Sequence, residues 1–260
     1  MNITIIDAFT DRPFRGNPAA VCLLDSEISE ERMQRIANEM NLSETAILFK
    51  LDEGYSLRWF TPVTEVDLCG HATLASAHYL WEEAGVSETE LSFITRSGVL
   101  TAKREDEWIQ LDFPSEEAQE CVPPAELTEG LGTAYSYVGR NRMDYIVEVE
   151  DEDTVCNLQP NMNVWSKMQG RGVIVTSKSA RPGIDFVSRC FFPAVGIDED
   201  PVTGSAHCCL GPYWGDKLNK RELTAMQLSS REGYLLVSLQ DKRVLLRGQA
   251  VTTLRGQLVL

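Results

Sequence analysis

DLCGHATLA at residues 67–75 and DPVTGSAHCC at residues 200–209 are the stretches that decide the fold. In both, a glycine is followed by a polar side chain and then by small residues, the composition of a helix that other parts of the chain surround closely. Each stretch predicts a helix start whose first N–H groups and positive dipole end can hold an anion. One copy lies in each half of the chain. We therefore expect two related halves, and two helix starts that define one cleft if the halves face each other.

Strand patterns surround both motifs. In the first half we expect a helix from Ser29 to Asn41, a buried helix from about His71 to Ala84, and strands at 4–9, 19–24, 46–49, 56–60, 91–95, 100–103 and 108–113. In the second half we expect strands near 145–149, 172–176, 186–192, 235–239, 244–247 and 251–254. The pair Gly211-Pro212 predicts a second helix that is short or bent. This strand-rich order favours antiparallel strands around one buried helix in each half, an α+β fold, over a parallel βαβ wrap.

The domain boundary is expected near residue 115. A chain of 260 residues can hold one large domain or two medium ones. Residues 114–132 are rich in Pro, Glu and Gly without a clear period, so this segment is the predicted linker. The predicted domains are residues 1–115 and 116–250, with a C-terminal strand at about 250–260 that returns to the first domain.

Composition excludes several classes of protein. The net charge is −15, and residues 1–130 hold 25 acidic and 9 basic side chains against 14 and 15 in the remainder. Such a chain is a poor ligand for nucleic acid or an anionic membrane. The 7 cysteines include no Cys-x-x-Cys pair, and residues 1–7 resemble a strand rather than a signal peptide, so a reducing cytoplasm is expected. No Gly-x-Gly-x-x-Gly dinucleotide fingerprint is present, and the three histidines lack zinc-ligand spacing.

Glu44 and His71 are the first candidates for chemistry. Glu44 stands between a helix end and an apolar strand, which by position alone fits a solvent-facing loop carboxylate. At the mouth of a cleft with two anion-holding helix starts, it would instead remove a proton next to a carboxylate or carbonyl. His71 follows Gly70 at the first helix start; it is either a packed histidine or a hydrogen-bond donor or second proton carrier, with a pKa lowered by the helix dipole.

The second motif and Cys69 supply further candidates. Asp200 precedes a proline and is either a turn residue or a group that orients His71 or the substrate. Ser205, after Gly204, can bond a carboxylate. Cys69 precedes a helix start, where a lowered pKa would suit a racemase base. A two-thiol racemase needs a facing cysteine, however, and the corresponding position before Gly204 is Thr203.

Four motifs together resemble the phenazine-biosynthesis isomerase-like (PhzF-like) family. They occur in the family's order and span nearly the whole chain: FRGNPAAV at 14–21, NLSETA at 41–46, LCGHAT at 68–73 and EDPVTGSA at 199–206. The resemblance implies a diaminopimelate epimerase-like fold, in which two pseudo-symmetric domains each wrap a mostly antiparallel, barrel-like sheet around a central helix. It also implies an active site between the domains without metal or other cofactor, and a homodimer.

The resemblance also assigns roles to residues. It places the catalytic glutamate, histidine and aspartate on Glu44, His71 and Asp200, and substrate binding on Gly70, Gly204 and Ser205. We therefore expect an isomerase that shifts a proton on a small amino or keto acid, with Glu44 as general acid and base. Two alternatives remain: a racemase or epimerase that uses Cys69, and a binding or regulatory protein that keeps the fold without turnover.

Overall fold

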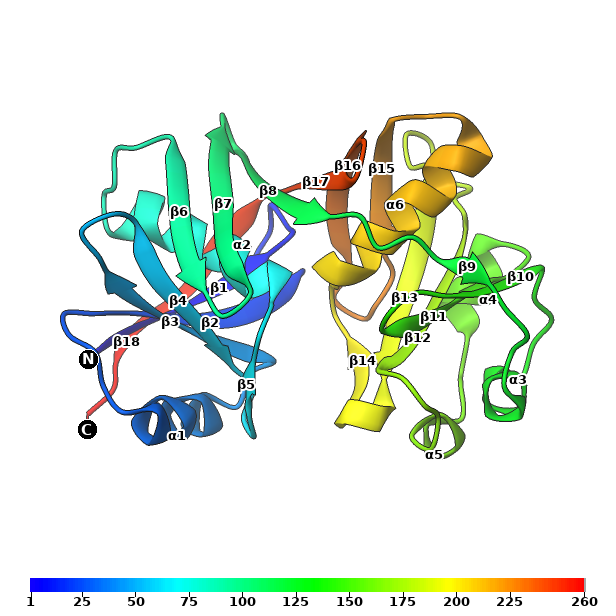
Figure 1. Cartoon of the computed structure of the whole chain (residues 1–260), viewed down its shortest axis with the longest axis horizontal. Helices are drawn as coiled ribbons and strands as arrows, with labels where there is room; N and C mark the ends of the chain where they lie inside the picture. The colour runs from blue at the N-terminus through cyan, green and yellow to red at the C-terminus, as the bar shows by residue number, and fades with distance from the viewer. Residues whose placement is uncertain (260) are drawn as a thin grey trace. The chain divides into compact units, whose positions relative to one another are not determined.

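The computed structural model of the protein describes residues 1–259 and divides the chain into two compact units (Figure 1). Unit 1 comprises residues 1–113 and the C-terminal segment from residue 245, and unit 2 comprises residues 114–244. The C-terminal strand β18 (Ala250–Gln257) belongs to unit 1, where it pairs antiparallel with the first strand, β1 (Asn2–Ala8).

Strands outnumber helices in both units within residues 1–259. The further elements of unit 1 are β2 (Asn17–Leu24), α1 (Glu30–Met40), β3 (Glu44–Lys50), β4 (Tyr55–Phe60), β5 (Glu65–Val66), α2 (Gly70–His78), the π-helical turn η1 (Tyr79–Glu83), β6 (Glu90–Thr95), β7 (Gly98–Glu105) and β8 (Trp108–Pro114). Unit 2 contains β9 (Gln119–Glu120), α3 (Ala125–Leu131), β10 (Tyr137–Arg140), β11 (Asp144–Glu148), α4 (Glu152–Asn157), α5 (Met162–Trp165), β12 (Gly172–Lys178), β13 (Phe186–Phe192), the 3₁₀ turn η2 (Pro193–Val195), β14 (Ile197–Asp200), α6 (Gly204–Leu218), β15 (Glu222–Gln227) and β16 (Gly233–Gln240). Strand β17 (Arg243–Gly248) spans the unit boundary.

The two units repeat one order of connections. In unit 1, β1 pairs antiparallel with β2, β2 parallel with β3 across α1, β3 antiparallel with β4, and β4 parallel with β6 across α2. In unit 2, β10, β11, β12, β13 and β15 pair in the same sequence of antiparallel and parallel ladders, with α4 and α5 at the first crossover and α6 at the second. The expected pseudo-symmetric α+β architecture is confirmed, and its parallel pairs occur where a helix connects two strands.

Helix α2 is the buried helix of unit 1. Every residue from His71 to Ala77 is buried, and the helix contacts β1, β2, β3, β7 and β18. Two hydroxyl groups inside it return to the helix backbone: Thr73 Oγ1 donates to Cys69 O at 2.6 Å and Ser76 Oγ donates to Ala72 O at 2.7 Å. These bonds satisfy polar side chains that would otherwise be costly in an apolar interior. The small-residue pattern therefore predicted both the helix and its burial.

Helix α6 corrects the expectation of a short helix, because it runs for 15 residues through Pro212 to Leu218. A proline inside a helix lacks the N–H that would bond the carbonyl four residues earlier, here Cys208 O. The backbone N–H of Glu116 donates to Cys208 O at 3.0 Å instead. The segment before α3 thus satisfies the carbonyl that Pro212 leaves without a helical partner.

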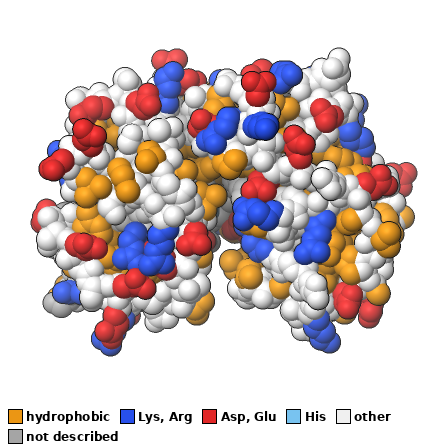
Figure 2. Space-filling view, viewed as in Figure 1, with side chains coloured by type: hydrophobic (Ala, Val, Ile, Leu, Met, Phe, Trp, Pro, Cys, Tyr) orange, Lys and Arg blue, Asp and Glu red, His pale blue; other side chains and the backbone are white. Residues whose placement is uncertain are grey.

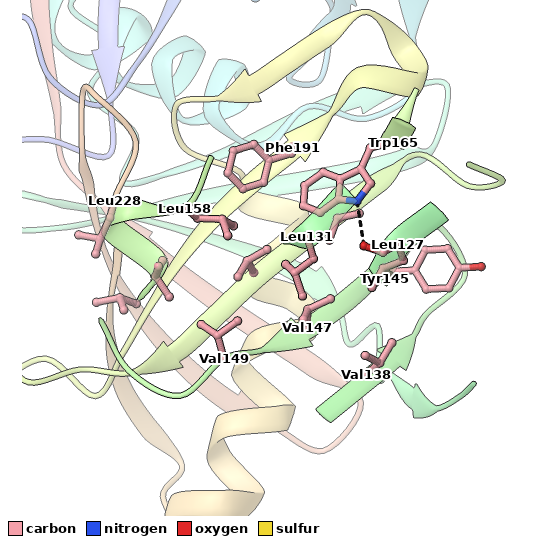
Figure 3. Close-up of a cluster of buried hydrophobic side chains, with 14 residues drawn as sticks. Leu127, Leu131, Val138, Tyr145, Val147, Val149, Leu158, Trp165, Phe191 and Leu228 are labelled. Carbon is pink, nitrogen blue, oxygen red and sulfur yellow. Dashed lines mark hydrogen bonds between the residues drawn. The ribbon is translucent and has the colours of Figure 1, made fainter. Parts of the chain in front are cut away.

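The core of unit 2 corrects a second expectation, that residues 114–132 form a linker. This segment includes β9 and α3, and α3 contributes Leu127 and Leu131 to a cluster of buried apolar side chains (Figure 3). The buried indole of Trp165, from α5, donates its Nε1–H to Leu127 O at 3.2 Å. The short α3 lacks a long apolar period, and its tertiary contacts hold it in place.

Acidic, basic and apolar side chains intermix on the face of the molecule in Figure 2. Within residues 1–259, no helix combines the length and the apolar character needed to cross a membrane.

Candidate active site

One group of candidate site residues forms where three segments of unit 1 end or begin. Gly16 has φ +64°, and a Cβ there would lie 2.1 Å from Ala8 O, so only glycine fits the turn that places Asn17 opposite Ala8. Asn41 ends α1 in the left-handed conformation, and β3 begins three residues later at Glu44. Because β2 and β3 are parallel, with Ala19 opposite Glu44, both strands start at the same edge of the sheet.

The His71 ring contacts a side chain from each of these segments. His71 is the second residue of α2, and its Nε2 lies 3.0 Å from Glu44 Oε2. On the other side of the ring, Nδ1 lies 3.1 Å from Asn17 Nδ2 and 3.6 Å from Cys69 Sγ. The side chains of His71 and Glu44 are 5% and 13% exposed. Among the described residues, Glu44 Oε2 and His71 Nε2 have no hydrogen-bond partner beyond this mutual contact.

The charges in this cluster correct two expectations. Burial alone would lower the pKa of His71, but the Cys69 sulfur and the Glu44 carboxylate beside the ring hold that pKa well above its ordinary value. Burial, reinforced by the nearby Glu44 charge, raises the pKa of the Cys69 thiol. The helix start therefore neither keeps His71 neutral nor activates Cys69, because adjacent charges raise the pKa of the ring and burial raises the pKa of the thiol. Of these two causes for His71, the Glu44 charge is the one present at neutral pH, since Cys69 then keeps its proton.

The same three side chains resemble a set of metal ligands but do not make a good one. One ligand-type atom from each of Glu44, Cys69 and His71 lies within 4.8 Å of the others. The ring presents Nε2 to the carboxylate and Nδ1 to the sulfur, so its two short contacts use different ring nitrogens. A thiol with a raised pKa also binds metals poorly, since the thiolate is the ligand. We assign no metal to this cluster.

In unit 2, Asp200 is integrated into the turn before α6. Its Oδ2 accepts a 2.5 Å hydrogen bond from Thr203 Oγ1, and its backbone carbonyl accepts from Gln227 Nε2 at 2.7 Å. Gln227 Oε1 in turn accepts from the backbone N–H of Thr203 at 2.8 Å. Asp200 is 9% exposed. Two side chains thus fix the backbone immediately before Gly204, the first residue of α6.

Arg171 brings a positive charge to the start of α6. Its Nη2 donates to Ser205 Oγ at 2.9 Å, and its Nε and Nη2 donate to the two oxygens of Asp144 at 2.9 and 2.5 Å. Asp144 is fully buried, whereas the Arg171 side chain is 29% exposed. Burial opposes the charge on Arg171, and the bonds to Asp144 outweigh burial and raise its pKa. A held guanidinium, a hydroxyl and a helix N-terminus together favour an anion.

The predicted residues therefore form two local groups. Gly70, His71 and Glu44 lie together in unit 1, and Asp200, Gly204 and Ser205 lie together in unit 2. Glu44 is the mostly buried first residue of a strand rather than a solvent-facing loop carboxylate. Sequence reasoning missed Asn17, Ser43, Asp144 and Arg171 as site residues. Asn17 and Ser43 stand inside two of the motifs quoted above, whereas nothing local in the sequence marks Asp144 and Arg171.

Comparison with known proteins agrees with this architecture. The family model for phenazine biosynthesis-like proteins matches residues 6–256. An uncharacterized isomerase of Halalkalibacterium halodurans is 59% identical over 99% of this chain and 98% of its own. A crystal structure of a PhzF-family protein from Enterococcus faecalis superimposes with a TM-score of 0.96 at 42% identity, covering 100% of this chain and 99% of the other.

A more distant similarity concerns the fold alone. A hydroxyproline epimerase from Agrobacterium vitis is 10% identical and has a TM-score of 0.61 over 98% of this chain and 91% of its own. The chain belongs to the phenazine biosynthesis-like (PhzC-PhzF) family. The names of its curated relatives agree with the expected enzyme class, an isomerase.

Proposed function

We propose that this member of the phenazine biosynthesis-like family is an isomerase that moves a proton on a small carboxylate-bearing amino or keto acid, with Glu44 as the general acid and base. The observation that carries the proposal is the contact between Glu44 Oε2 and His71 Nε2. Both atoms are buried, they lie 3.0 Å apart, and neither has a hydrogen-bond partner within residues 1–259. A carboxylate in such a setting is available to a substrate proton, and the histidine orients it.

The proposed chemistry moves one proton and no net electrons. The Glu44 carboxylate takes a proton from a carbon α or vinylogous to the substrate carboxylate, and the C–H electron pair enters the adjacent π system. The protonated Glu44 then returns the proton to another carbon of that system, which shifts the double bond. The carbanion-like intermediate needs positive charge or N–H donors near the substrate carboxylate.

The start of α6 supplies groups of that kind in unit 2. Ser205 Oγ, Arg171 and the first N–H groups from Gly204 onward can each bond a carboxylate oxygen. We propose that they hold the substrate carboxylate, together with the N–H groups at Gly70. Asp200 stabilises the turn through Thr203 and faces the substrate in this proposal.

The thiol alternative has less support. A racemase that used Cys69 would need its thiolate at working pH, whereas burial and the Glu44 charge raise the pKa of this thiol. A binding protein without turnover would not need a buried carboxylate oxygen that contacts only a histidine, whereas proton transfer uses such a group.

Substitution of Glu44 tests the proposal. Wild-type protein is first screened in heavy water against a library of small amino and keto acids, with mass spectrometry to detect deuterium incorporation. On any acid that exchanges, Glu44→Gln keeps the size of the side chain and removes its basicity, so it is expected to slow exchange by a factor of ~10²–10⁴.

Two variants serve as controls. Glu90→Gln makes the same change at the first residue of strand β6 in the same unit, where the side chain is exposed, and should exchange at the wild-type rate. Cys69→Ser should retain most of the activity. Exchange that survives Glu44→Gln but is abolished by Cys69→Ser would replace the proposed mechanism with a thiol mechanism.

A further inference from the structure

The motif at residues 14–21 has a conformational explanation at Gly16, but the proposed function gives no role to the side chain of Asn17. Asn17 is fully buried at the start of β2. Its amide lies between two site segments: Nδ2 is 3.1 Å from His71 Nδ1, and Oδ1 accepts from Ser43 Oγ at 3.2 Å. Ser43 immediately precedes Glu44, so one amide connects the histidine to the segment that carries the carboxylate.

We propose that Asn17 is a positioning residue that selects the tautomer of His71: its amide donates to Nδ1, so that the neutral ring keeps its proton on Nε2 and directs that proton to Glu44. The inference rests on the proposed function for its catalytic meaning. Which ring nitrogen of His71 carries the proton can be tested without a substrate.

The orientation of the amide follows from Ser43. Because Ser43 Oγ donates to Oδ1, the Nδ2 donor of Asn17 faces the ring. Cys69 Sγ lies on the same side of the ring, 3.6 Å from Nδ1, and its raised pKa means that it carries a proton there. Nδ1 thus faces two donors, and a neutral imidazole has one N–H, so that N–H is on Nε2.

This tautomer suits the contact with Glu44. An Nε2–H group faces Glu44 Oε2 at 3.0 Å, so its positive end attracts the carboxylate, and the second oxygen is left to accept a substrate proton. An Nδ1–H tautomer would place the Nε2 lone pair against a carboxylate oxygen, an arrangement of two acceptors. Asn17 therefore acts on Glu44 through His71.

Asn17 also opposes double protonation of the ring. An imidazolium has a donor at Nδ1, so the amide must turn until Oδ1 accepts, and Ser43 Oγ must then accept from Nδ2. The titratable groups that face the ring are Glu44 from β3 and Cys69 before α2, and Glu44 favours the imidazolium. The neutral form exists above the raised pKa of His71, and Nδ1 is the nitrogen that loses its proton.

The test is ¹⁵N NMR of the histidine ring nitrogens as a function of pH. The chain has only 3 histidines, so His78→Gln and His207→Gln variants identify the His71 signals. In the wild type, Nδ1 should lose its proton as the pH rises, while Nε2 remains protonated. Asn17→Asp replaces the donor with a negatively charged acceptor, which should keep the proton on Nδ1 and raise the midpoint of the titration by about 1–3 pH units.

Two further variants complete the experiment. Asn2→Asp places the same new charge at the exposed first residue of β1 and should leave the His71 titration unchanged. Asn17→Leu removes the amide donor and leaves only the Cys69 thiol at Nδ1, so the share of the Nδ1–H tautomer in the neutral ring should rise, which decides the matter if Asn17→Asp does not fold. Loss of the proton from Nε2 in the wild type, or a sole Nε2–H tautomer in Asn17→Leu, would overturn the inference.

Kinetics on an exchanging acid provide the link to catalysis. A protonated His71 ring attracts the Glu44 carboxylate and makes it a weaker base, so activity should fall at the acidic end of the pH profile. In Asn17→Asp, the acidic limb of the kcat profile should move to higher pH, and KM should stay nearly unchanged. Loss of the proton from Nε2 in the wild type, together with an inactive Glu44→Gln variant, would support the proposed function alone, whereas the expected tautomer with an active Glu44→Gln variant would support the positioning alone.

Discussion

The two helix starts share a connection but differ in chemistry. In unit 1, the first residues of β2, β3 and α2 bring together Asn17, Glu44 and His71. In unit 2, the corresponding crossovers bring Asp144 at the start of β11 and Arg171 just before β12 to Ser205 at the start of α6. The first group can exchange a proton, and the second holds a fixed positive charge.

This difference shows how a repeated fold can carry different chemistry at equivalent positions. The order of parallel and antiparallel ladders determines where strand ends and helix N-termini meet, and it is the same in both units. The residue types at those ends determine which groups gather there: a carboxylate and a histidine in unit 1, and a guanidinium and a hydroxyl in unit 2. A buried carboxylate beside a histidine is responsive to pH, whereas a guanidinium with a two-point bond to a buried carboxylate is charged at every pH at which the protein is folded.

The largest expected effect on stability concerns Asp144. Asp144→Ala leaves the mostly buried Arg171 guanidinium without its two-point partner, so the free energy of unfolding should fall by about 3 kcal/mol. Urea unfolding followed by circular dichroism measures the change. The double variant Asp144→Leu/Arg171→Met removes both charges and should be more stable than Asp144→Ala.

An ion pair in the same unit, whose arginine is exposed, is the control. Arg142 and Glu116 form an ion pair in which the arginine side chain is 68% exposed, and Glu116→Ala should cost less than about 1 kcal/mol. Equal losses for Asp144→Ala and Glu116→Ala would mean that unit 2 does not depend on its charged pair for stability.

Much of this comparison could be predicted from the sequence. The small residues after Gly70 predicted a buried helix because a surface helix would need a polar face, and the structure buries every residue from His71 to Ala77. The family motifs also identified Glu44 and His71, which the structure places in contact. Helix α3 was missed because short helices depend on tertiary contacts, here those of Leu127 and Leu131 with the core of unit 2.

The remaining features depend on contacts between distant residues. Arg171 lies 34 residues from Ser205 in sequence, and no local pattern connects them. The length of α6 was also unpredictable from its own residues, since the bond from Glu116 N–H to Cys208 O compensates for Pro212. The direction of the His71 pKa depends on Glu44 and Cys69, whose distances from the ring only the fold determines.

A smaller effect is expected for anion binding in unit 2. Arg171→Met removes a charge-assisted donor beside Ser205, which is worth about 1.5–3 kcal/mol. The Kd of a small carboxylate such as benzoate or succinate, measured by calorimetry, should therefore rise by about 10- to 100-fold. Arg142→Met, at an exposed arginine of the same unit, should leave the Kd unchanged. An unchanged Kd in Arg171→Met would remove the carboxylate-holding role from unit 2.

The smallest expected effect concerns the pH dependence of stability. The pKa values of the histidines near the two helix starts are shifted in opposite directions, upward for His71 and downward for His207. His207, the fourth residue of α6, is fully buried; Nδ1 contacts Thr203 O at 2.8 Å, and Nε2 has no hydrogen-bond partner among residues 1–259. Burial lowers its pKa to about 4. Between pH ~6.5 and 4 the unfolded chain therefore binds a proton that the folded chain does not, so stability falls by about 1.4 kcal/mol per pH unit as the pH drops through this window.

His71 has the opposite sign. Its pKa is raised in the folded protein, so its contribution to stability is complete below pH ~6.5 and is lost as the pH rises through the folded value. His207→Gln should flatten the acidic side of the curve of unfolding free energy against pH, and His71→Gln should flatten the neutral-to-alkaline side. Each substitution also shifts the whole curve, but only the slopes report titration. If His71→Gln flattened the acidic side instead, the His71 pKa would be lowered, and the contrast between a charged pair in unit 1 and an isolated buried histidine in unit 2 would be wrong.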